Sequence, residues 1–357
     1  MENLALVPFV PEEEEQKEEK TSPGGKRHGK KIITLITAFF SAVSILFYSV
    51  SAAGFIKESE ITGKAVVRLM IGDYAGGIEN VYPLPLSDGY SENDSISGSE
   101  SDITLERLER LDTGEIIPSV INAETPYDIN ISDTLSQERV IQSLDNIYST
   151  FGEKAPVVLI IHTHGTEAYA DHASDGYRTD GKDGVIGIGS VISDVLTECG
   201  INTIHCEIPF DRTDFNTAYY SAAIAIRDYL REYPSISYII DVHRDSVLLS
   251  DGTYYATEAK IDGQSAAKLM FVVGTDYAGS EHKNWRDNLA LCTRLEVAAE
   301  NKNPGLMRGL NIRAASFNEQ YTSGSMLLEV GSCANTFDEA ARSAEAFAKV
   351  LADEIIG

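Results

Sequence analysis

Apolar runs separated by amphipathic stretches mark the second half of the chain. Runs that predict buried strands lie at 157–161, 237–241, 269–274 and 326–330, with a weaker one at 201–205. Helical patterns separate them, at about 185–199, 216–232, 284–301 and 337–355. Thr336 and Glu339 have the spacing of a capping box before the last of these helices. Strands that alternate with helices predict an α/β fold, with a mostly parallel central sheet flanked by helices.

The first half of the chain contains a long apolar segment. Residues 32–56 carry no charged side chain, and a helix of this length would span about 37 Å, which is enough to cross a bilayer. Basic residues between 26 and 31 precede it, so the positive-inside rule leaves residues 1–31 in the cytoplasm and the rest of the chain outside. A cleaved signal peptide is the alternative, but the long acidic leading region favours an uncleaved transmembrane helix.

The segment after this helix is expected to be a stalk. The stalk covers residues 57–106. Residues 57–85 have no long hydrophobic period, and residues 86–104 are rich in Ser, Asp and Gly, a composition typical of flexible linkers. A globular domain is then expected over 107–357. Its motifs lie within 150–357.

Charge and cysteine content narrow the function. The chain has 29 Lys+Arg against 55 Asp+Glu, a net charge of −26, and so acidic a surface argues against binding to nucleic acid. The four cysteines show no C-x-x-C spacing, which argues against a zinc ribbon.

Ionisable residues gather where predicted strands end. His162, His164 and Glu167 follow the strand at 157–161, His243 follows the strand at 237–241, and Glu329 lies near the end of the strand at 326–330. Open α/β sheets bind ligands at the carboxyl ends of their strands. We therefore expect these side chains to share one edge of the sheet.

Two His and one carboxylate, with a fourth position open to water, form a common catalytic zinc site. His164, Glu167 and His243 are candidate ligands, and Glu329 is the candidate general base. His162 competes with His164, because residues i and i+2 of a strand share a face. A purely structural role for these side chains is the alternative. No HExxH helix, G-x-S-x-G elbow or phosphate-binding loop is present in the sequence.

Several motifs together give the chain a family resemblance. They are HTHGTEAY (162–169), DVHRDS (241–246), MFVVG (270–274), HKNWRDNLAL (282–291), NPGLMRGL (303–310) and GSMLLEVGSCANT (324–336). In order and spacing they resemble the stage II sporulation protein P family, peptidoglycan hydrolases of endospore-forming bacteria. That family is similar in turn to zinc-dependent N-acetylmuramoyl-L-alanine amidases.

Residues matching those amidases are His164-Gly165, His243 and Glu329…Gly331…Asn335. The zinc-binding Glu of the amidases lies further from the first His than Glu167 lies from His164.

The resemblance implies a zinc-amidase (phosphorylase/hydrolase-like) fold and cleavage of the amide between muramic acid and the stem peptide. It also implies a second, endopeptidase activity on cross-links and a role in spore engulfment. The implied partners are peptidoglycan and the stage II sporulation proteins D, a lytic transglycosylase, and M, a membrane protein. Arg244, Asn288 and Asn318 are expected substrate contacts, and Trp285 is either a contact or a core residue. Another zinc-dependent wall peptidase and a non-enzymatic wall-binding scaffold are the alternatives.

Overall fold

The computed structural model describes most of the second half of the chain. The described residues are 109–110, 116–173, 176–178, 181–249 and 251–357. All of them belong to the second of two units, Met1–Glu79 and Asn80–Gly357, into which the chain divides. The predicted tail, transmembrane helix and stalk lie outside them. Within the described residues, no helix combines the length and the apolar character needed to cross a membrane.

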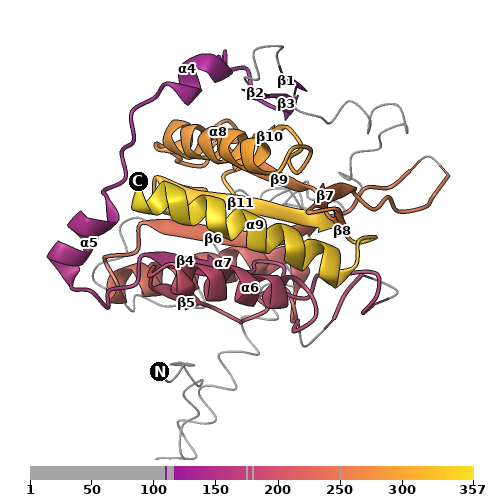
Figure 1. The fold of residues 1–357 in the computed structure, drawn as a ribbon. Coiled ribbons are helices and arrows are strands. Elements are labelled where there is room, and N and C mark those ends of the chain that lie inside the picture. The colour runs from indigo at the N-terminus through magenta and orange to yellow at the C-terminus, as the bar shows by residue number, and fades with distance from the viewer. Residues whose placement is uncertain (1–108, 111–115, 174–175, 179–180, 250) are drawn as a thin grey trace, which may run out of the picture. The chain divides into compact units, whose positions relative to one another are not determined.

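The described residues form a central seven-stranded sheet (Figure 1). Its strands are, in spatial order, β3 (Val120–Ala123), β10 (Leu310–Arg313), β9 (Leu269–Gly274), β11 (Gly324–Ser332), β6 (Tyr238–Asp245), β4 (Val158–Ile161) and β5 (Thr203–His205). Neighbouring strands are parallel except β9 and β11, which pair antiparallel. The sheet therefore consists of two parallel halves that run in opposite directions.

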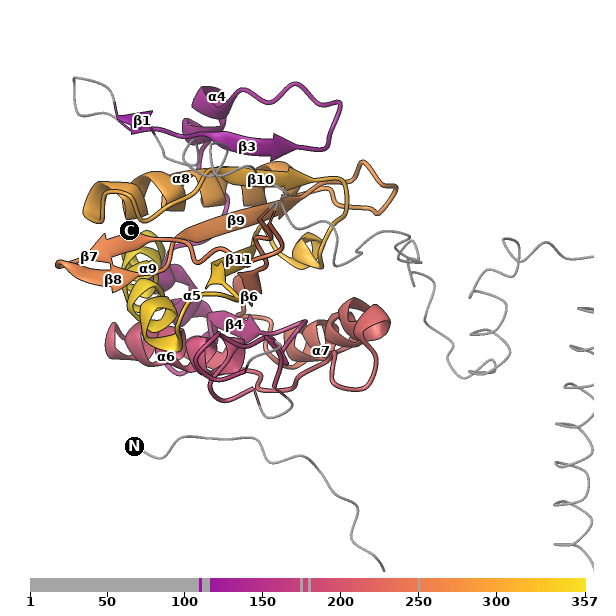
Figure 2. The same ribbon diagram turned by 90° about the vertical axis from the view of Figure 1, so that its right-hand side faces the viewer.

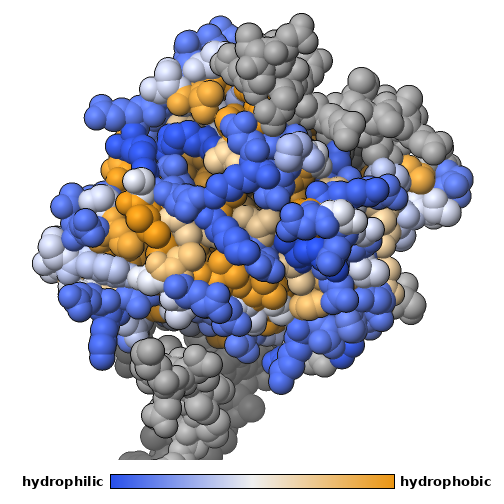
Figure 3. Space-filling view, in the orientation of Figure 1, coloured by the Kyte–Doolittle hydropathy of each residue, from blue (hydrophilic) through white to orange (hydrophobic). Residues whose placement is uncertain are grey.

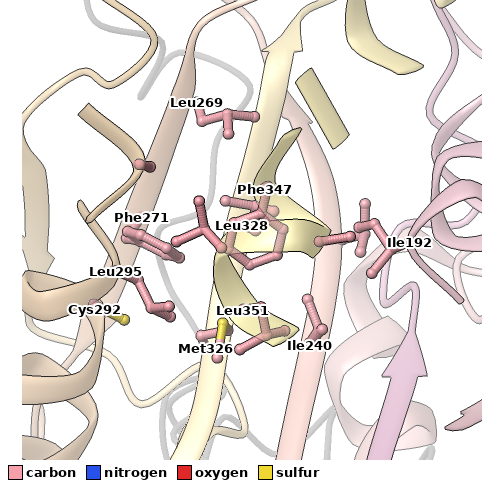
Figure 4. Packing of buried hydrophobic residues seen from close by; sticks show 14 of the residues in the cluster. Ile192, Ile240, Leu269, Phe271, Cys292, Leu295, Met326, Leu328, Phe347 and Leu351 are labelled. Atoms are coloured by element: carbon pink, nitrogen blue, oxygen red, sulfur yellow. The ribbon is translucent and has the colours of Figure 1, made fainter. Parts of the chain in front are cut away.

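Helices cover both faces of this sheet (Figures 1 and 2). They are α6 (Val185–Glu198), α7 (Ala218–Glu232), α8 (Trp285–Lys302) and α9 (Phe337–Ile356). The first, third and fourth pack on one face, where Phe271 and Leu328 of the sheet meet Phe347 of α9 in the main hydrophobic core (Figure 4). On the other face, α7 packs against β4 and β6 in a smaller cluster. The fold is thus three-layered.

Shorter elements complete the described part. They are β1 (Glu109–Arg110), β2 (Ile116–Ile117), β7 (Ala259–Ile261), β8 (Gln264–Ala266), α4 (Ile131–Leu135), α5 (Leu144–Phe151), η3 (Phe215–Thr217) and η4 (Glu319–Tyr321). Hydrophilic residues cover much of the outer face on which α8 and α9 lie (Figure 3). This agrees with a composition in which 24% of the residues are charged.

The predicted strands and helices are confirmed, and so is the mostly parallel sheet flanked by helices. The capping box at the start of α9 is also present: Glu339 N donates to Thr336 Oγ1 at 3.3 Å, and Thr336 N donates to Glu339 Oε2 at 3.0 Å. Two short strands of the sheet, β3 and β10, were not predicted.

Strand direction decides which segments meet. β4, β6 and β11 are parallel, and their register places Ile161 beside Asp241 and His243 beside Glu329. β9 runs the other way, so its carboxyl end lies beside the beginning of β11. The segment that follows β9 therefore lies at the opposite edge of the sheet from the carboxyl ends of β4, β6 and β11.

Candidate active site

His164 lies at the centre of the candidate site. Its side chain is buried, its ring stacks on Phe215 at 4.1 Å between centroids, and its edge-on neighbour His243 is 5.4 Å away. Burial lowers the pKa of His164 to about 4. Neither ring nitrogen has a hydrogen-bond partner among the described residues. Such buried, unpartnered polar atoms are rare in folded proteins and need an explanation.

His162 does not share the environment of His164. Its Nε2 lies 2.8 Å from Nε2 of His205, and its Nδ1 lies 3.3 Å from the carbonyl oxygen of Val242. It also packs against α6, where a Cβ on Gly189 would come within 2.5 Å of the imidazole. His162 and His164 do not share a face as expected. β4 ends at Ile161, so the two-residue period of the strand stops before either histidine. Of the two, the structure brings His164 to His243.

A turn built around Gly165 places His164. A Cβ at this position would lie 2.6 Å from the Cα of Pro209, so only glycine allows this close approach. Thr166, the next residue, donates from its backbone N at 3.1 Å and from Oγ1 at 2.6 Å to the carboxylate of Asp211. The loop between β5 and η3 is thereby fastened beside the end of β4.

Glu167 connects this turn to β6. Its Oε2 is 3.5 Å from Nδ1 of His243 and accepts a hydrogen bond from the backbone N of Arg244 at 3.1 Å. The Arg244 guanidinium lies 3.6 Å from Oε1. Burial raises the pKa of Glu167, but Arg244 and His243 together bring it below its ordinary value. Glu167 is therefore held as a carboxylate.

His243 lies between two carboxylates. Nδ1 faces Glu167, while Nε2 is 3.0 Å from Oδ1 of Asp241. Burial lowers the pKa of His243, but Asp241 and Glu167 raise it well above its ordinary value. A metal ion that took one nitrogen would have to displace the proton that these carboxylates stabilise.

Glu329 faces His243 from the neighbouring strand. The two residues are register partners in β11 and β6, and Glu329 is only 8% exposed. Burial and the nearby Asp245 raise the pKa of Glu329 to about 8. Its Oε2 has no hydrogen-bond partner among the described residues. A carboxyl with a pKa near neutrality, beside His243, is suited to accepting and returning a proton.

The end of β11 is shaped by two residues of the motif that follows Glu329. Gly331 has φ 71°, a left-handed conformation that favours glycine. Asn335 Oδ1 accepts hydrogen bonds from the backbone N of Ser332 and of Thr257, both at 3.0 Å. Both residues thus determine the path of the chain beyond Glu329.

The three expected substrate contacts are buried. Arg244 donates to the carbonyl oxygens of Ala168 and Gly176, at 3.3 and 3.0 Å, and so holds the turn that carries Glu167. Asn318 donates to the carbonyl oxygen of Tyr219 at 2.9 Å, while its Oδ1 has no partner among the described residues.

Asn288 lies at the other end of β11. Its Nδ2 donates to the carbonyl oxygens of Thr322 and Ser325, both at 2.9 Å. Ser325 precedes Glu329 by four residues in a strand, which corresponds to about 13 Å. The structure therefore does not bring Asn288 to His164, His243 and Glu329, and the reversed direction of β9 is the reason. Trp285 is 2% exposed and stacks on Tyr127, so it is a core residue.

Two aspartates of the site were missed by sequence reasoning. Asp241 precedes His243 by two residues in β6, and this spacing is a signal that was available. Asp211 lies 3.8 Å from Nδ1 of His164, but it comes from a loop whose path no sequence pattern reveals.

The residues present fit zinc in their chemistry. Among the described residues, no three His, Cys, Asp or Glu side chains form a ready-made metal-binding group. The pair Glu167 Oε2 and His243 Nδ1 is nevertheless separated by 3.5 Å, close to the roughly 3.4 Å between donor atoms of a tetrahedral zinc site. The nitrogens of His164, which have no hydrogen-bond partner among the described residues, supply a third donor of the right type. Two donors are thus in position and the third is adjacent.

Comparison with known proteins gives a family match and several structural neighbours. The sequence matches the family model described as Stage II sporulation protein P over residues 92–352, a span that includes every residue of the site. Stage II sporulation protein P of Bacillus subtilis (strain 168) is 31% identical over 219 residues, or 57% of this chain and 52% of that protein. The chain thus matches about half the length of this relative.

Similar solved structures include three amidases. The N-acetylmuramoyl-L-alanine amidase AmiC2 of Nostoc punctiforme is 14% identical with a TM-score of 0.32, covering 56% of this chain and 95% of its own. Ami1 from Mycobacterium smegmatis is 12% identical with a TM-score of 0.35, covering 57% and 98%. The N-acetylmuramoyl-L-alanine amidase from Clostridium difficile 630 is 14% identical with a TM-score of 0.32, covering 57% and 96%.

Proposed function

Because the chain belongs to the stage II sporulation protein P family, we propose that it is a membrane-anchored, zinc-dependent peptidoglycan hydrolase. It cleaves the amide between muramic acid and the stem peptide, as an N-acetylmuramoyl-L-alanine amidase, and cleavage of peptide cross-links is a second activity. The observation that carries this proposal is the convergence of His164, His243 and Glu329, each with a buried polar atom that lacks a hydrogen-bond partner among the described residues. A missing ligand explains those atoms.

His164, Glu167 and His243 are the proposed zinc ligands. When bound, zinc polarises a carbonyl oxygen and lowers the pKa of a bound water towards 7. Arg244 keeps Glu167 in its carboxylate form and fixes its orientation. The stacked ring of Phe215 limits the access of water to His164.

Glu329 is the proposed general base and acid. Its carboxylate accepts a proton from the attacking water as the water oxygen bonds to the amide carbon. It then returns this proton to the leaving nitrogen as the C–N bond breaks. The products are the lactoyl carboxyl group on the glycan and the free amine of the stem peptide. A pKa of about 8 suits a group that must both take up and release a proton.

The cellular setting is proposed on the family and the apolar segment. Residues 32–56 would anchor the chain, with residues 1–31 in the cytoplasm and the hydrolase domain on the outer side. There the enzyme acts on peptidoglycan during engulfment of the spore. The stage II sporulation protein D, which cleaves glycan, and the membrane protein M are the proposed partners.

Digestion of purified peptidoglycan tests the function. The chain, with its bound metal measured, is incubated with peptidoglycan in the presence and absence of a chelator, and the products are identified by mass. Release of intact stem peptides that stops with the chelator and in His243→Ala supports the amidase. Shortened stem peptides indicate a carboxypeptidase instead. Equal results for the wild type and His243→Ala, with the glycan-cleaving partner present, favour a non-enzymatic scaffold.

A further inference from the structure

Asp241 is a buried carboxylate that the proposed chemistry does not use. It is 3% exposed and lies two residues before His243, on the same face of β6. Its Oδ1 accepts a hydrogen bond from the backbone N of Thr163 at 2.8 Å, and its Oδ2 accepts one from Thr163 Oγ1 at 2.5 Å. Both oxygens are therefore held by the residue between the two histidines that follow β4.

This fixed carboxylate lies against one nitrogen of His243. Its Oδ1 is 3.0 Å from Nε2. The contact is an ion pair rather than an aligned hydrogen bond, because Nε2 has no hydrogen-bond partner of suitable geometry among the described residues. A carboxylate in this position favours a proton on Nε2, and in a neutral imidazole the other nitrogen, Nδ1, is then the one with a free lone pair.

We propose that Asp241 is a positioning residue, which holds His243 with Nε2 protonated and presents Nδ1 to zinc beside Glu167. The inference rests on the proposed function, in that zinc is the ligand. Metal-binding histidines commonly donate their second N–H to a carboxylate, which fixes both tautomer and ring orientation. The 3.5 Å between Nδ1 and Glu167 Oε2 places these two atoms as neighbouring donors.

The opposite assignment, with Asp241 as ligand and Glu167 as the supporting group, fits the fold less well. Asp241 pairs with Ile161 of β4 and Leu327 of β11, so it lies inside the sheet. Glu167 follows the end of β4, at the edge where Glu329 and His243 meet. A site that must admit a peptidoglycan strand is expected at this edge, since ligands bind beyond the carboxyl ends of strands.

Zinc affinity of two variants tests the proposal. The full-length chain, Asp241→Ala and Asp241→Asn are purified in detergent and titrated with zinc against a chromophoric chelator. Loss of the carboxylate in Asp241→Ala is expected to weaken zinc binding by about 10- to 100-fold. Asp241→Asn, whose amide oxygen can still lie against Nε2–H and accept from Thr163 N, is expected to stay within a few-fold of the wild type. Thr163→Val removes the hydroxyl donor to Oδ2 but keeps the backbone donor to Oδ1, the oxygen beside Nε2, so it is expected to weaken zinc binding less than Asp241→Ala.

A spectroscopic measurement distinguishes positioning from a structural role. With ¹⁵N-labelled histidine and zinc bound, the wild type should show His243 with Nε2 protonated and Nδ1 bound to the metal; Asp241→Asn should keep this pattern. Zinc on Nε2, or wild-type affinity in Asp241→Ala, would overturn the inference and leave the hydrolase intact. A wild-type chain that binds no zinc would overturn the proposed function and this inference together. If Asp241→Ala does not fold, the wild-type and Asp241→Asn spectra still decide.

Discussion

Replacement of Glu329 by Gln should stabilise the folded chain and at the same time abolish hydrolysis. The carboxyl group is 8% exposed, its Oε2 lacks a partner among the described residues, and its pKa is raised from 4.5 to about 8. Below pH 4.5 the folded and unfolded chains both hold the proton. As the pH rises from 4.5 towards 8, the unfolded chain releases the proton while the folded chain keeps it, so stability is lost in this window.

The size of the effect follows from that window. Each pH unit in which only the unfolded chain is ionised costs about 1.4 kcal/mol. Between pH 4.5 and pH 7 the loss is on the order of 3 kcal/mol. Gln cannot ionise, so Glu329→Gln should recover most of this, equivalent to a rise in Tm of roughly 5–10 °C for a domain of this size. Loss of the proton acceptor should lower kcat by about 10²- to 10⁴-fold.

Thermal unfolding of both proteins, measured from pH 4 to pH 8 with a chelator present, tests the stability. The two melting curves should coincide near pH 4 and separate as the pH rises. Peptidoglycan digestion and zinc titration of the same samples complete the assay, and the variant should bind zinc and fail to cleave. A variant whose Tm runs parallel to that of the wild type across the range would refute the raised pKa. Unimpaired turnover would remove Glu329 from the mechanism.

Three further substitutions probe the surroundings of the site and the core. Gly165→Ala places a Cβ 2.6 Å from the Cα of Pro209, so denaturant unfolding should show a loss of about 1–3 kcal/mol, and unchanged stability would contradict the packing described. Glu296→Met removes a fully buried carboxyl whose pKa is raised well above its ordinary value by burial. Calorimetry should show a gain of about 1–3 kcal/mol at pH 7 that becomes smaller as the pH falls towards 4.5, and an equal gain at both pH values would count against the raised pKa. Phe215→Ala exposes His164, whose pKa should rise from about 4 towards 6.5 in an NMR titration with a chelator present; Phe215→Tyr should leave it low.

Much of the fold and the centre of the site could be predicted because both depend on local pattern. Continuous apolar runs such as 157–161 fix buried strands, and the polar residues that end each run mark the edge where ligands bind. His243 and Glu329 were found in this way, and the register of β6 with β11 places them side by side. β3 and β10 were not predicted because an asparagine interrupts the apolar residues of each (VINA and LNIR), whereas β4, which is equally short, is continuously apolar (VLII).

The remaining details depend on where strands stop and which way they run. Sequence pattern does not show that β4 ends at Ile161, so it could not separate His162, which joins His205 under α6, from His164. Nor does it show that β9 lies antiparallel to β11, which takes Asn288 to the far edge. The end of β4 and the direction of β9 are both set by packing between segments that are distant in the chain.

The position of Glu329 within the sheet explains how its carboxyl group stays buried although burial is unfavourable. β11, like β9, has a parallel neighbour on one side and an antiparallel neighbour on the other, and Glu329 has a register partner in each neighbour of β11, His243 in β6 and Met270 in β9. Two ladders therefore fix its backbone, and the carboxyl cannot escape burial by a local shift. Glu167, on a turn, depends instead on Arg244 for its orientation. Partial unfolding should therefore disorder the proposed zinc ligands of the turn, His164 and Glu167, before it displaces Glu329, the proposed general base.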